Sequence, residues 1–168
     1  MRWFAGRGCA ATGIDRDAAA LAVAASWGTV VQADIENGPW PLPAAGNTEG
    51  PETFDAVVVT NYLWRPLLGL MARSLSPGGV LLYETFAKGN ETVGKPSRPD
   101  FLLQPGELLS AFGHLRVVAY EDGFSASPDR FVQRIVAVAP AKPRTAIAPP
   151  LGSADPDLPH RYPLTAAR

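Results

Sequence analysis

The sequence predicts an α/β fold built on a mostly parallel β-sheet. Two short apolar segments, residues 9–15 and 29–34, each end in an aspartate, and an alanine-rich helical pattern separates them. A third segment, residues 54–60, is a continuous β-branched run of the kind found in strands that are buried on both faces. Strands that alternate with helical patterns indicate crossover connections, and crossovers join parallel strands.

Length and composition restrict the class of protein. The 168 residues fit one domain, and a formal net charge of −1 without a cluster of basic residues argues against nucleic-acid binding. The single cysteine, Cys9, has no internal partner, which favours a reducing compartment. No apolar run is long enough to span a membrane. We therefore expect a cytoplasmic protein that acts on a small molecule, with neither a nucleic-acid nor a membrane partner; the oligomeric state is not predicted.

The first half of the chain supplies two helices and a loop. Residues 2–8 resemble the last turns of an amphipathic helix. A second helix is expected over residues 18–26, with Asp15 or Asp17 as its N-cap. Residues 35–53, rich in Gly, Pro and Asn, form a long loop.

A helix and a fourth strand follow the β-branched segment. Pro66 fits the first turn of the helix, whose leucine stripe ends at Leu75. Residues 76–79 have the composition of a turn, and residues 80–86 that of a strand. A long polar loop then runs over residues 87–99.

The last third of the chain closes the domain. A helix opens at Gln104 and ends near Phe112. Two strands, residues 115–122 and 130–139, are joined by so short a link that they must be antiparallel. We assign residues 1–140 to the domain, and the proline-rich residues 141–168 to a disordered tail.

Three side chains near predicted strand ends each allow two interpretations. A carboxylate at the end of a parallel strand, such as Asp15, either binds a ribose or caps the next helix. Glu84 is either a general base or an anchor of the loop that follows it. Trp64 either shapes a substrate pocket or packs in the core.

The order of elements resembles the class I S-adenosylmethionine-dependent methyltransferases, most closely the small bacterial tellurite-resistance type. The motifs that carry the resemblance are Thr12-Gly13-Ile14-Asp15, Gln32-Ala33-Asp34-Ile35, Phe54-Asp55-Ala56-Val57-Val58-Val59, Leu75-Ser76-Pro77-Gly78-Gly79-Val80-Leu81 and the terminal antiparallel pair. The resemblance covers roughly residues 1–140. It implies a Rossmann-like methyltransferase sheet with a C-terminal antiparallel hairpin.

The resemblance also implies S-adenosylmethionine as cofactor, a small-molecule methyl acceptor and no metal. The cofactor-binding residues it implies are Asp15, Arg16, Asp34, Ile35, Asn61 and Leu63; the catalytic residues it implies are Asn61, Tyr62 and Glu84. A carboxylate at Asp15 suits the ribose because it accepts two hydrogen bonds from a cis-diol. Asp34 faces the adenine amino group, and the loop after residue 60 lies near the methyl group.

The first strand and the glycine-rich loop of this family would precede Trp3, and the sequence shows neither. We expect that the sequence starts at an internal methionine of a longer gene product, which impairs cofactor binding. That strand lies between the strands that end at Asp15 and Thr60. These two strands then either pair with each other or keep unpaired edges, which would leave the chain marginally stable.

Two other functions remain open at this stage. A nicotinamide-dependent oxidoreductase would also bind a ribose through Asp15, although the terminal hairpin and residues 76–79 favour the methyltransferase. A non-catalytic scaffold would keep the fold without a working cofactor site.

Overall fold

A computed structural model of the chain describes residues 1–42 and 53–141. The tail predicted over residues 141–168 lies, apart from its first residue, outside the described residues, and so do residues 43–52 of the predicted loop. The strands are β1 (Thr12–Asp15), β2 (Thr29–Gln32), β3 (Phe54–Thr60), β4 (Leu75–Phe86), β5 (Arg116–Ser125) and β6 (Arg130–Val138). The α-helices are α1 (Arg2–Ala5), α2 (Ala18–Ala24), α3 (Leu68–Arg73) and α4 (Glu107–Phe112). Short 3₁₀ turns are η1 (Ala25–Trp27), η2 (Arg65–Leu67), η3 (Asn90–Thr92) and η4 (Pro99–Phe101). None of the described helices is long and apolar enough to cross a membrane.

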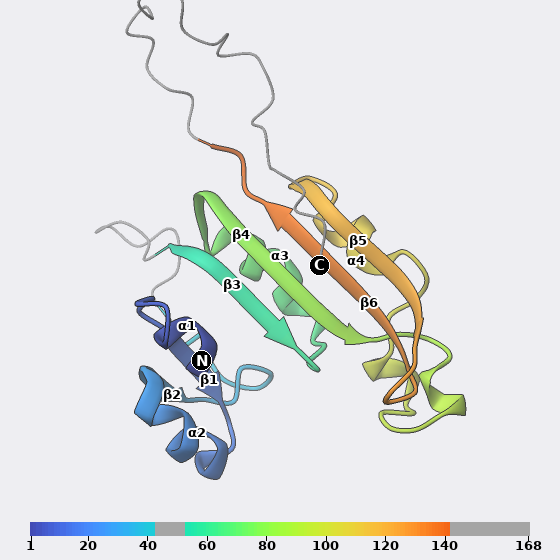
Figure 1. Ribbon diagram of the computed structural model, residues 1–168, viewed down its shortest axis with the longest axis horizontal. Helices are drawn as coiled ribbons and strands as arrows, with labels where there is room; N and C mark the ends of the chain where they lie inside the picture. Colours follow the sequence, from blue (N-terminus) through green and yellow to red (C-terminus); the bar gives the residue numbers. More distant parts are fainter. Residues whose placement is uncertain (43–52, 142–168) are drawn as a thin grey trace, which may run out of the picture.

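The described strands form two separate sheets (Figure 1). β1 and β2 pair in parallel, whereas the larger sheet has the order β3-β4-β6-β5. In the larger sheet β3 and β4 are parallel, and β6 is antiparallel to both β4 and β5. The predicted α/β fold with a C-terminal antiparallel pair is therefore confirmed. Of the two arrangements expected for the strands ending at Asp15 and Thr60, the structure has the one in which they do not pair with each other.

The predicted turn at residues 76–79 lies inside β4 and not before it. Phe54 of β3 pairs with Leu75, but its second neighbour Ala56 pairs with Val80, so the register shifts across the glycines. Gly78 has a φ of +82°, which a glycine adopts without strain. The composition of residues 76–79 predicts a turn, but the strand pairs on either side of them keep these residues within the sheet.

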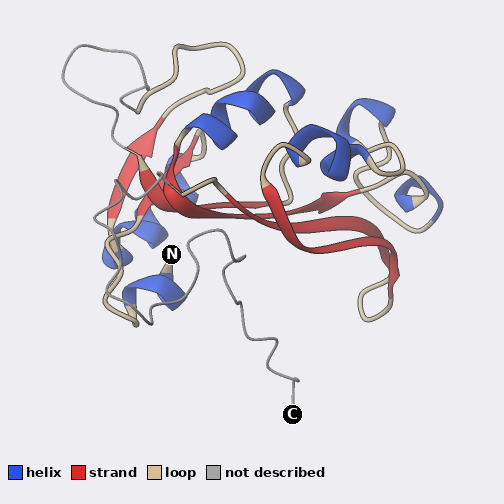
Figure 2. Cartoon of the chain, turned by 90° about the horizontal axis from the view of Figure 1, so that it is seen from above, coloured by secondary structure: helices blue, strands red, loops and turns tan. Residues whose placement is uncertain are grey.

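The helices α3 and α4 cover one face of the larger sheet (Figure 2). The core lies beneath them, and its most deeply buried side chains include Leu81, Tyr83, Leu108, Phe112 and Ile135. On β3 and β4 the alternate residues Val58 and Leu82 point to the other face and are 45% and 36% exposed. We call this the open face of the sheet. On β3 this face is apolar, because the β-branched run places apolar side chains on both faces of the strand, as in strands that are covered on both sides.

Candidate functional site

The candidate site lies at the carboxyl ends of β1, β2 and β3. Asp15 ends β1 opposite Gln32, the last residue of the parallel strand β2, and Asp34 follows two residues later. The Gln32 amide donates from Nε2 to the Arg16 carbonyl at 3.2 Å, which ties the two strand ends together. The sequence therefore brings both predicted carboxylates to one rim, as parallel pairing requires.

Asp15 keeps one carboxylate oxygen available. Its Oδ1 accepts a hydrogen bond from the Asp17 backbone N–H at 2.9 Å. Within the described ranges, no hydrogen bond reaches Oδ2. Asp17, not Asp15, is the N-cap of α2, because its Oδ1 accepts from the Ala19 N–H at 2.8 Å. The helix-cap interpretation therefore belongs to Asp17, and Asp15 stands free to accept from a ligand.

Asp34 organises the turn that follows β2. Its Oδ1 accepts from the backbone N–H groups of Glu36 and Asn37 at 3.0 and 3.2 Å, and its Oδ2 accepts from Asn37 Nδ2 at 3.0 Å. The Asn37 side chain, followed by the two backbone N–H groups, holds the pKa of Asp34 below its ordinary value. The group is therefore a carboxylate at neutral pH, and the neighbouring Ile35 packs partly buried against the core.

The loop after β3 is held to β4 by two hydrogen bonds. The Asn61 N–H donates to the Glu84 carbonyl at 2.9 Å, and the buried Tyr83 hydroxyl donates to the Tyr62 carbonyl at 2.9 Å. Asn61 has a φ of +54°, a left-handed conformation that asparagine tolerates better than most residues. Leu63 is only 5% exposed, and its side chain belongs to the core. A ligand could therefore contact Leu63 only through its backbone.

The Tyr62 hydroxyl and the Trp40 indole Nε1 are buried donors that make no hydrogen bond of good geometry within the described residues. The Tyr62 hydroxyl lies near the Glu36 carboxylate. Burial, and then the negative charge of Glu36, raise the pKa of Tyr62 to about 12, so the hydroxyl keeps its proton. Buried donors without a hydrogen bond cost folding free energy, so a bound water or another acceptor would stabilise them. The sequence pattern points to Tyr62 but not to Trp40, because residues 35–53 have the composition of a loop.

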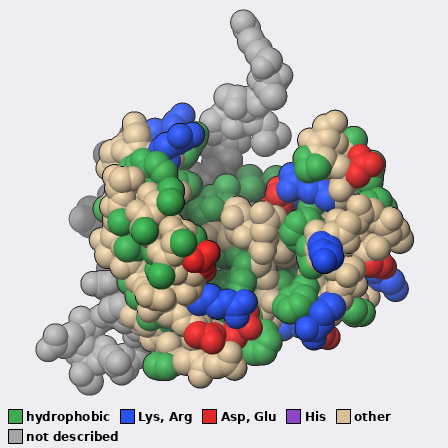
Figure 3. All heavy atoms as spheres, turned by 90° about the horizontal axis from the view of Figure 1, so that it is seen from below, with side chains coloured by type: hydrophobic (Ala, Val, Ile, Leu, Met, Phe, Trp, Pro, Cys, Tyr) green, Lys and Arg blue, Asp and Glu red, His purple; other side chains and the backbone are tan. Residues whose placement is uncertain are grey.

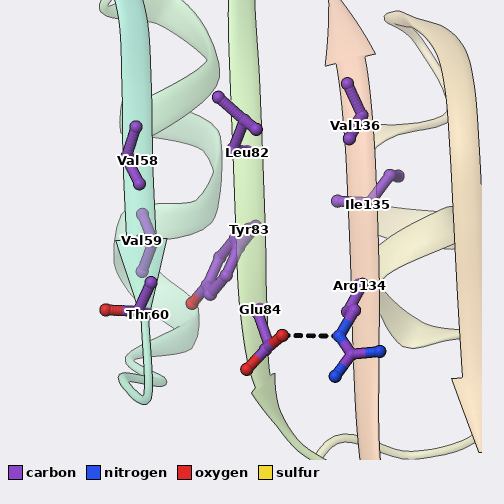
Figure 4. Close-up of a pocket in the computed structure, with 9 residues that line it drawn as sticks. All are labelled: Val58, Val59, Thr60, Leu82, Tyr83, Glu84, Arg134, Ile135 and Val136. Carbon is purple, nitrogen blue, oxygen red and sulfur yellow. Dashed lines mark hydrogen bonds and ion pairs between the residues drawn. The ribbon is translucent and has the colours of Figure 1, made fainter. Parts of the chain in front are cut away.

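Glu84 is bound on both oxygens. Oε2 accepts from Arg134 Nε at 2.5 Å (Figure 4). Oε1 accepts from Arg130 Nη1 at 2.9 Å, and Arg134 also pairs with Glu121. Both carboxylate oxygens of Glu84 are thus occupied by guanidinium donors, which is the arrangement of a structural anchor. No sequence pattern indicates these arginines, since they lie 46 and 50 residues from Glu84.

The open face is hollowed beside this ion-pair cluster. A cavity of about 270 Å³ is lined by Val58, Val59, Thr60, Leu82, Tyr83, Glu84, Arg134, Ile135 and Val136 (Figure 4). Seen from the side toward which β3 and β4 point, the molecule has a hollow between two lobes, with hydrophobic side chains on its floor (Figure 3). Trp64, by contrast, packs against the core, which is the second of the two interpretations given for it above.

Comparison with known proteins identifies the fold. No family model matches the sequence, and the search of curated proteins finds no match. Among solved structures, a SAM-dependent methyltransferase from Methanosarcina mazei superposes with a TM-score of 0.58 at 13% identity, over 82% of this chain and 85% of that one. TehB from Haemophilus influenzae gives 0.57 at 15% identity, over 79% and 50%.

A third structure of this fold carries a different activity in its name. The (4+2)-cyclase SpnF superposes with a TM-score of 0.54 at 15% identity, over 77% of this chain and 66% of that one. The chain thus spans half the length of TehB and 66% of SpnF. At these identities the likeness concerns architecture. The chain has the fold of the class I S-adenosylmethionine-dependent methyltransferases, as its sequence resemblance predicted.

Proposed function

We propose that the chain transfers a methyl group from S-adenosylmethionine to a small molecule. The observation that supports this most strongly is the pair of carboxylates, Asp15 and Asp34, at the ends of two adjacent parallel strands in a fold shared with methyltransferases. Open α/β sheets bind their ligands at this rim. A single cysteine and a near-neutral charge support a cytoplasmic protein with a small substrate.

The two carboxylates have complementary roles in this proposal. Asp15 accepts from the ribose hydroxyls, and its free Oδ2 is available for that purpose. Asp34 accepts from the adenine amino group through Oδ2, which has only the Asn37 side chain as a donor in the described structure. Ile35 lies beside the adenine ring, and Arg16 places a positive charge that helps to keep Asp34 ionised.

The loop after β3 serves the reacting end of the cofactor. The Tyr62 hydroxyl and Trp40 Nε1 are donors that a bound molecule with acceptor atoms would satisfy. Asn61 and the backbone of Leu63 complete this wall. The cofactor supplies a methyl group already activated by a positively charged sulfur, so the residues need only align the acceptor and exclude water.

Glu84 serves in this proposal as an anchor. Its two arginine partners hold the end of β4 and the start of β6 together, and the Asn61 N–H bonds to its carbonyl. A mutation of Glu84 would therefore displace the loop that carries Asn61 and Tyr62. This assigns it the second of the two roles that the sequence left open.

A second candidate function is a non-catalytic scaffold. The observation that favours it is the absence, in the described residues, of any strand pairing between β1 and β3. The cofactor site then spans two sheets that no hydrogen-bonded strand joins. The fold by itself does not imply methyl transfer, since SpnF has it under the name of a cyclase.

Calorimetric titration with S-adenosylhomocysteine, the demethylated cofactor, distinguishes these functions. We expect binding, and a loss of about 10–100-fold in affinity for Asp15→Asn, the usual effect of removing a charge-assisted hydrogen bond. The control is Asp55→Asn, an exposed aspartate at the opposite end of β3 that pairs only with Ser76 and should bind as the wild type does. If the folded protein bound no S-adenosylhomocysteine, the scaffold function would be favoured. Binding of NADH instead would favour the oxidoreductase.

A further inference from the structure

Arg65 connects the loop after β3 to a distant segment of the chain. It begins η2, directly after the loop Asn61–Trp64, and its guanidinium reaches Glu107 at the start of α4. We propose that Arg65 is a positioning residue that transmits cofactor binding to the segment 99–107. This rests on the proposed function, because it requires the loop after β3 to contact the cofactor.

Four hydrogen bonds join Arg65 to the segment. Nε and Nη2 donate to the two carboxylate oxygens of Glu107 at 2.6 and 3.0 Å, a bidentate pair. Nη1 donates to the Asp100 carbonyl at 2.8 Å and Nη2 to the Leu102 carbonyl at 3.0 Å. A planar, forked cation can make this set of bonds, whereas a lysine ammonium cannot. The backbone of η4 is thus fixed by a side chain 35–37 residues earlier in the sequence.

Glu107 bonds both to Arg65 and to the backbone of its own segment. Its Oε2 also accepts from the Gln104 backbone N–H at 2.8 Å. Burial pushes the pKa of Glu107 upward, but the hydrogen bonds from Arg65 and the Gln104 N–H outweigh it, and the pKa lies below its ordinary value. The pair is therefore ionised at neutral pH and binds the segment at both of its ends.

The segment forms one wall of a second cavity. This cavity, of about 240 Å³, is lined by Lys88, Glu91, Ser97, Pro99, Leu102 and Gln104. Its opposite wall is the start of the loop after β4, which is fixed by the Leu103 N–H donating to Phe86 and the Lys88 N–H donating to Leu103. Leu102 and Leu103 are buried, and the two backbone hydrogen bonds of Leu103 hold this part of the segment against Phe86 and Lys88. Its position relative to Lys88 therefore sets the shape of the cavity.

The other end of the connection is equally well fixed. Tyr62 receives the hydrogen bond from Tyr83, Leu63 is buried in the core, and the Leu67 N–H closes η2 onto the Trp64 carbonyl. Because the chain passes directly from this loop into Arg65, a ligand that rigidifies Asn61–Leu63 also restricts the guanidinium. The restriction is passed to the carbonyls of Asp100 and Leu102, which accept hydrogen bonds from that guanidinium.

Hydrogen exchange of residues 100–107, with and without saturating S-adenosylhomocysteine, tests this inference. In the wild type the ligand should slow exchange there. In Arg65→Met the ligand-free segment should exchange about tenfold faster, and the ligand should bind without slowing it. Arg65→Lys should be intermediate, and it is the second variant if Arg65→Met does not fold. The control is Arg98→Met, which removes the exposed Arg98–Asp100 pair in the same segment and should behave as the wild type does.

The outcomes separate the two proposals. Ligand-dependent slowing in Arg65→Met equal to that in Arg98→Met would overturn the coupling. If the folded wild type binds no S-adenosylhomocysteine, the proposed function is refuted and the coupling to it falls as well. The local role of Arg65 is then decided by the ligand-free exchange rates, and equal rates in the two variants would refute that role too.

Discussion

Replacement of Gln133 should reveal how α4 is attached to the larger sheet. Gln133 has no solvent exposure; its Oε1 accepts from the Leu108 N–H at 3.0 Å and its Nε2 donates to the Gln104 carbonyl at 2.6 Å. The Leu108 N–H belongs to the first turn of α4, where helices leave their backbone donors unpaired. Gln133→Leu keeps most of the side-chain volume and removes both bonds.

The magnitude follows from what each partner loses. Leu108 is fully buried, so its N–H has no water to replace the amide, at a cost of about 2 kcal/mol. Gln104 is exposed, and its carbonyl recovers part of the loss from solvent, which leaves about 1 kcal/mol. The apolar leucine offsets a fraction of this, so we expect a net loss of about 2–3 kcal/mol and a fall in Tm of roughly 5–10 °C.

Urea denaturation followed by circular dichroism measures this loss. The midpoint should fall with an unchanged m value, because the folded structure buries the same surface. The matched control is Gln32→Leu, since Gln32 is exposed and makes one hydrogen bond of 3.2 Å; its cost should stay below about 0.5 kcal/mol. Equal midpoints for the two variants would refute the reasoning that the buried amide holds the helix.

Two further predictions concern the candidate site. Tyr62→Phe removes a hydroxyl that lies near Glu36 and makes no hydrogen bond of good geometry within the described residues, so it should change the stability of the free chain by less than about 0.5 kcal/mol in urea denaturation and weaken S-adenosylhomocysteine binding by calorimetry. A destabilised variant with normal binding would contradict this. Asn37→Ala removes the main cause of the low Asp34 pKa and should raise it, as measured by carboxyl NMR titration. Because the folded-state pKa of Asp34 is lowered, its stabilising contribution is present above the unfolded value and disappears as pH falls through the folded value; an unchanged pKa in Asn37→Ala would refute the assignment.

The local elements of this fold could be predicted because their causes are local. The β-branched run of residues 54–60 is β3, and the aspartates at positions 15 and 34 follow parallel strand ends as their segments indicated. The excursion at residues 76–79 was expected as a turn because composition does not reveal that Leu75 pairs with Phe54. The helix expected over residues 18–26 is shorter in the structure, since α2 ends at Ala24 and gives way to η1 at Ala25.

The connections between elements could not be predicted in the same way. Arg65 and Glu107 lie 42 residues apart, and Glu84 and Arg134 lie 50 apart, so neither pair has a sequence spacing that brings it together. Their contacts depend on the register of β4 against β6 and on where α4 packs. Glu84 was therefore recognised by its position at a strand end, whereas its partners and its anchoring contacts required the three-dimensional structure.

The division into two sheets also affects how the chain unfolds. Asp15 and Asp34 belong to the small sheet, whereas Asn61 and Tyr62 follow a strand of the large one. In the part of the chain that the structure describes, no strand pairing joins the two sheets, so the small sheet can open without breaking a strand pair of the large one. A ligand held by residues from both sheets would bind only when both are folded. Ligand binding would then merge two unfolding transitions into one, and cooperativity itself would depend on occupancy of the site.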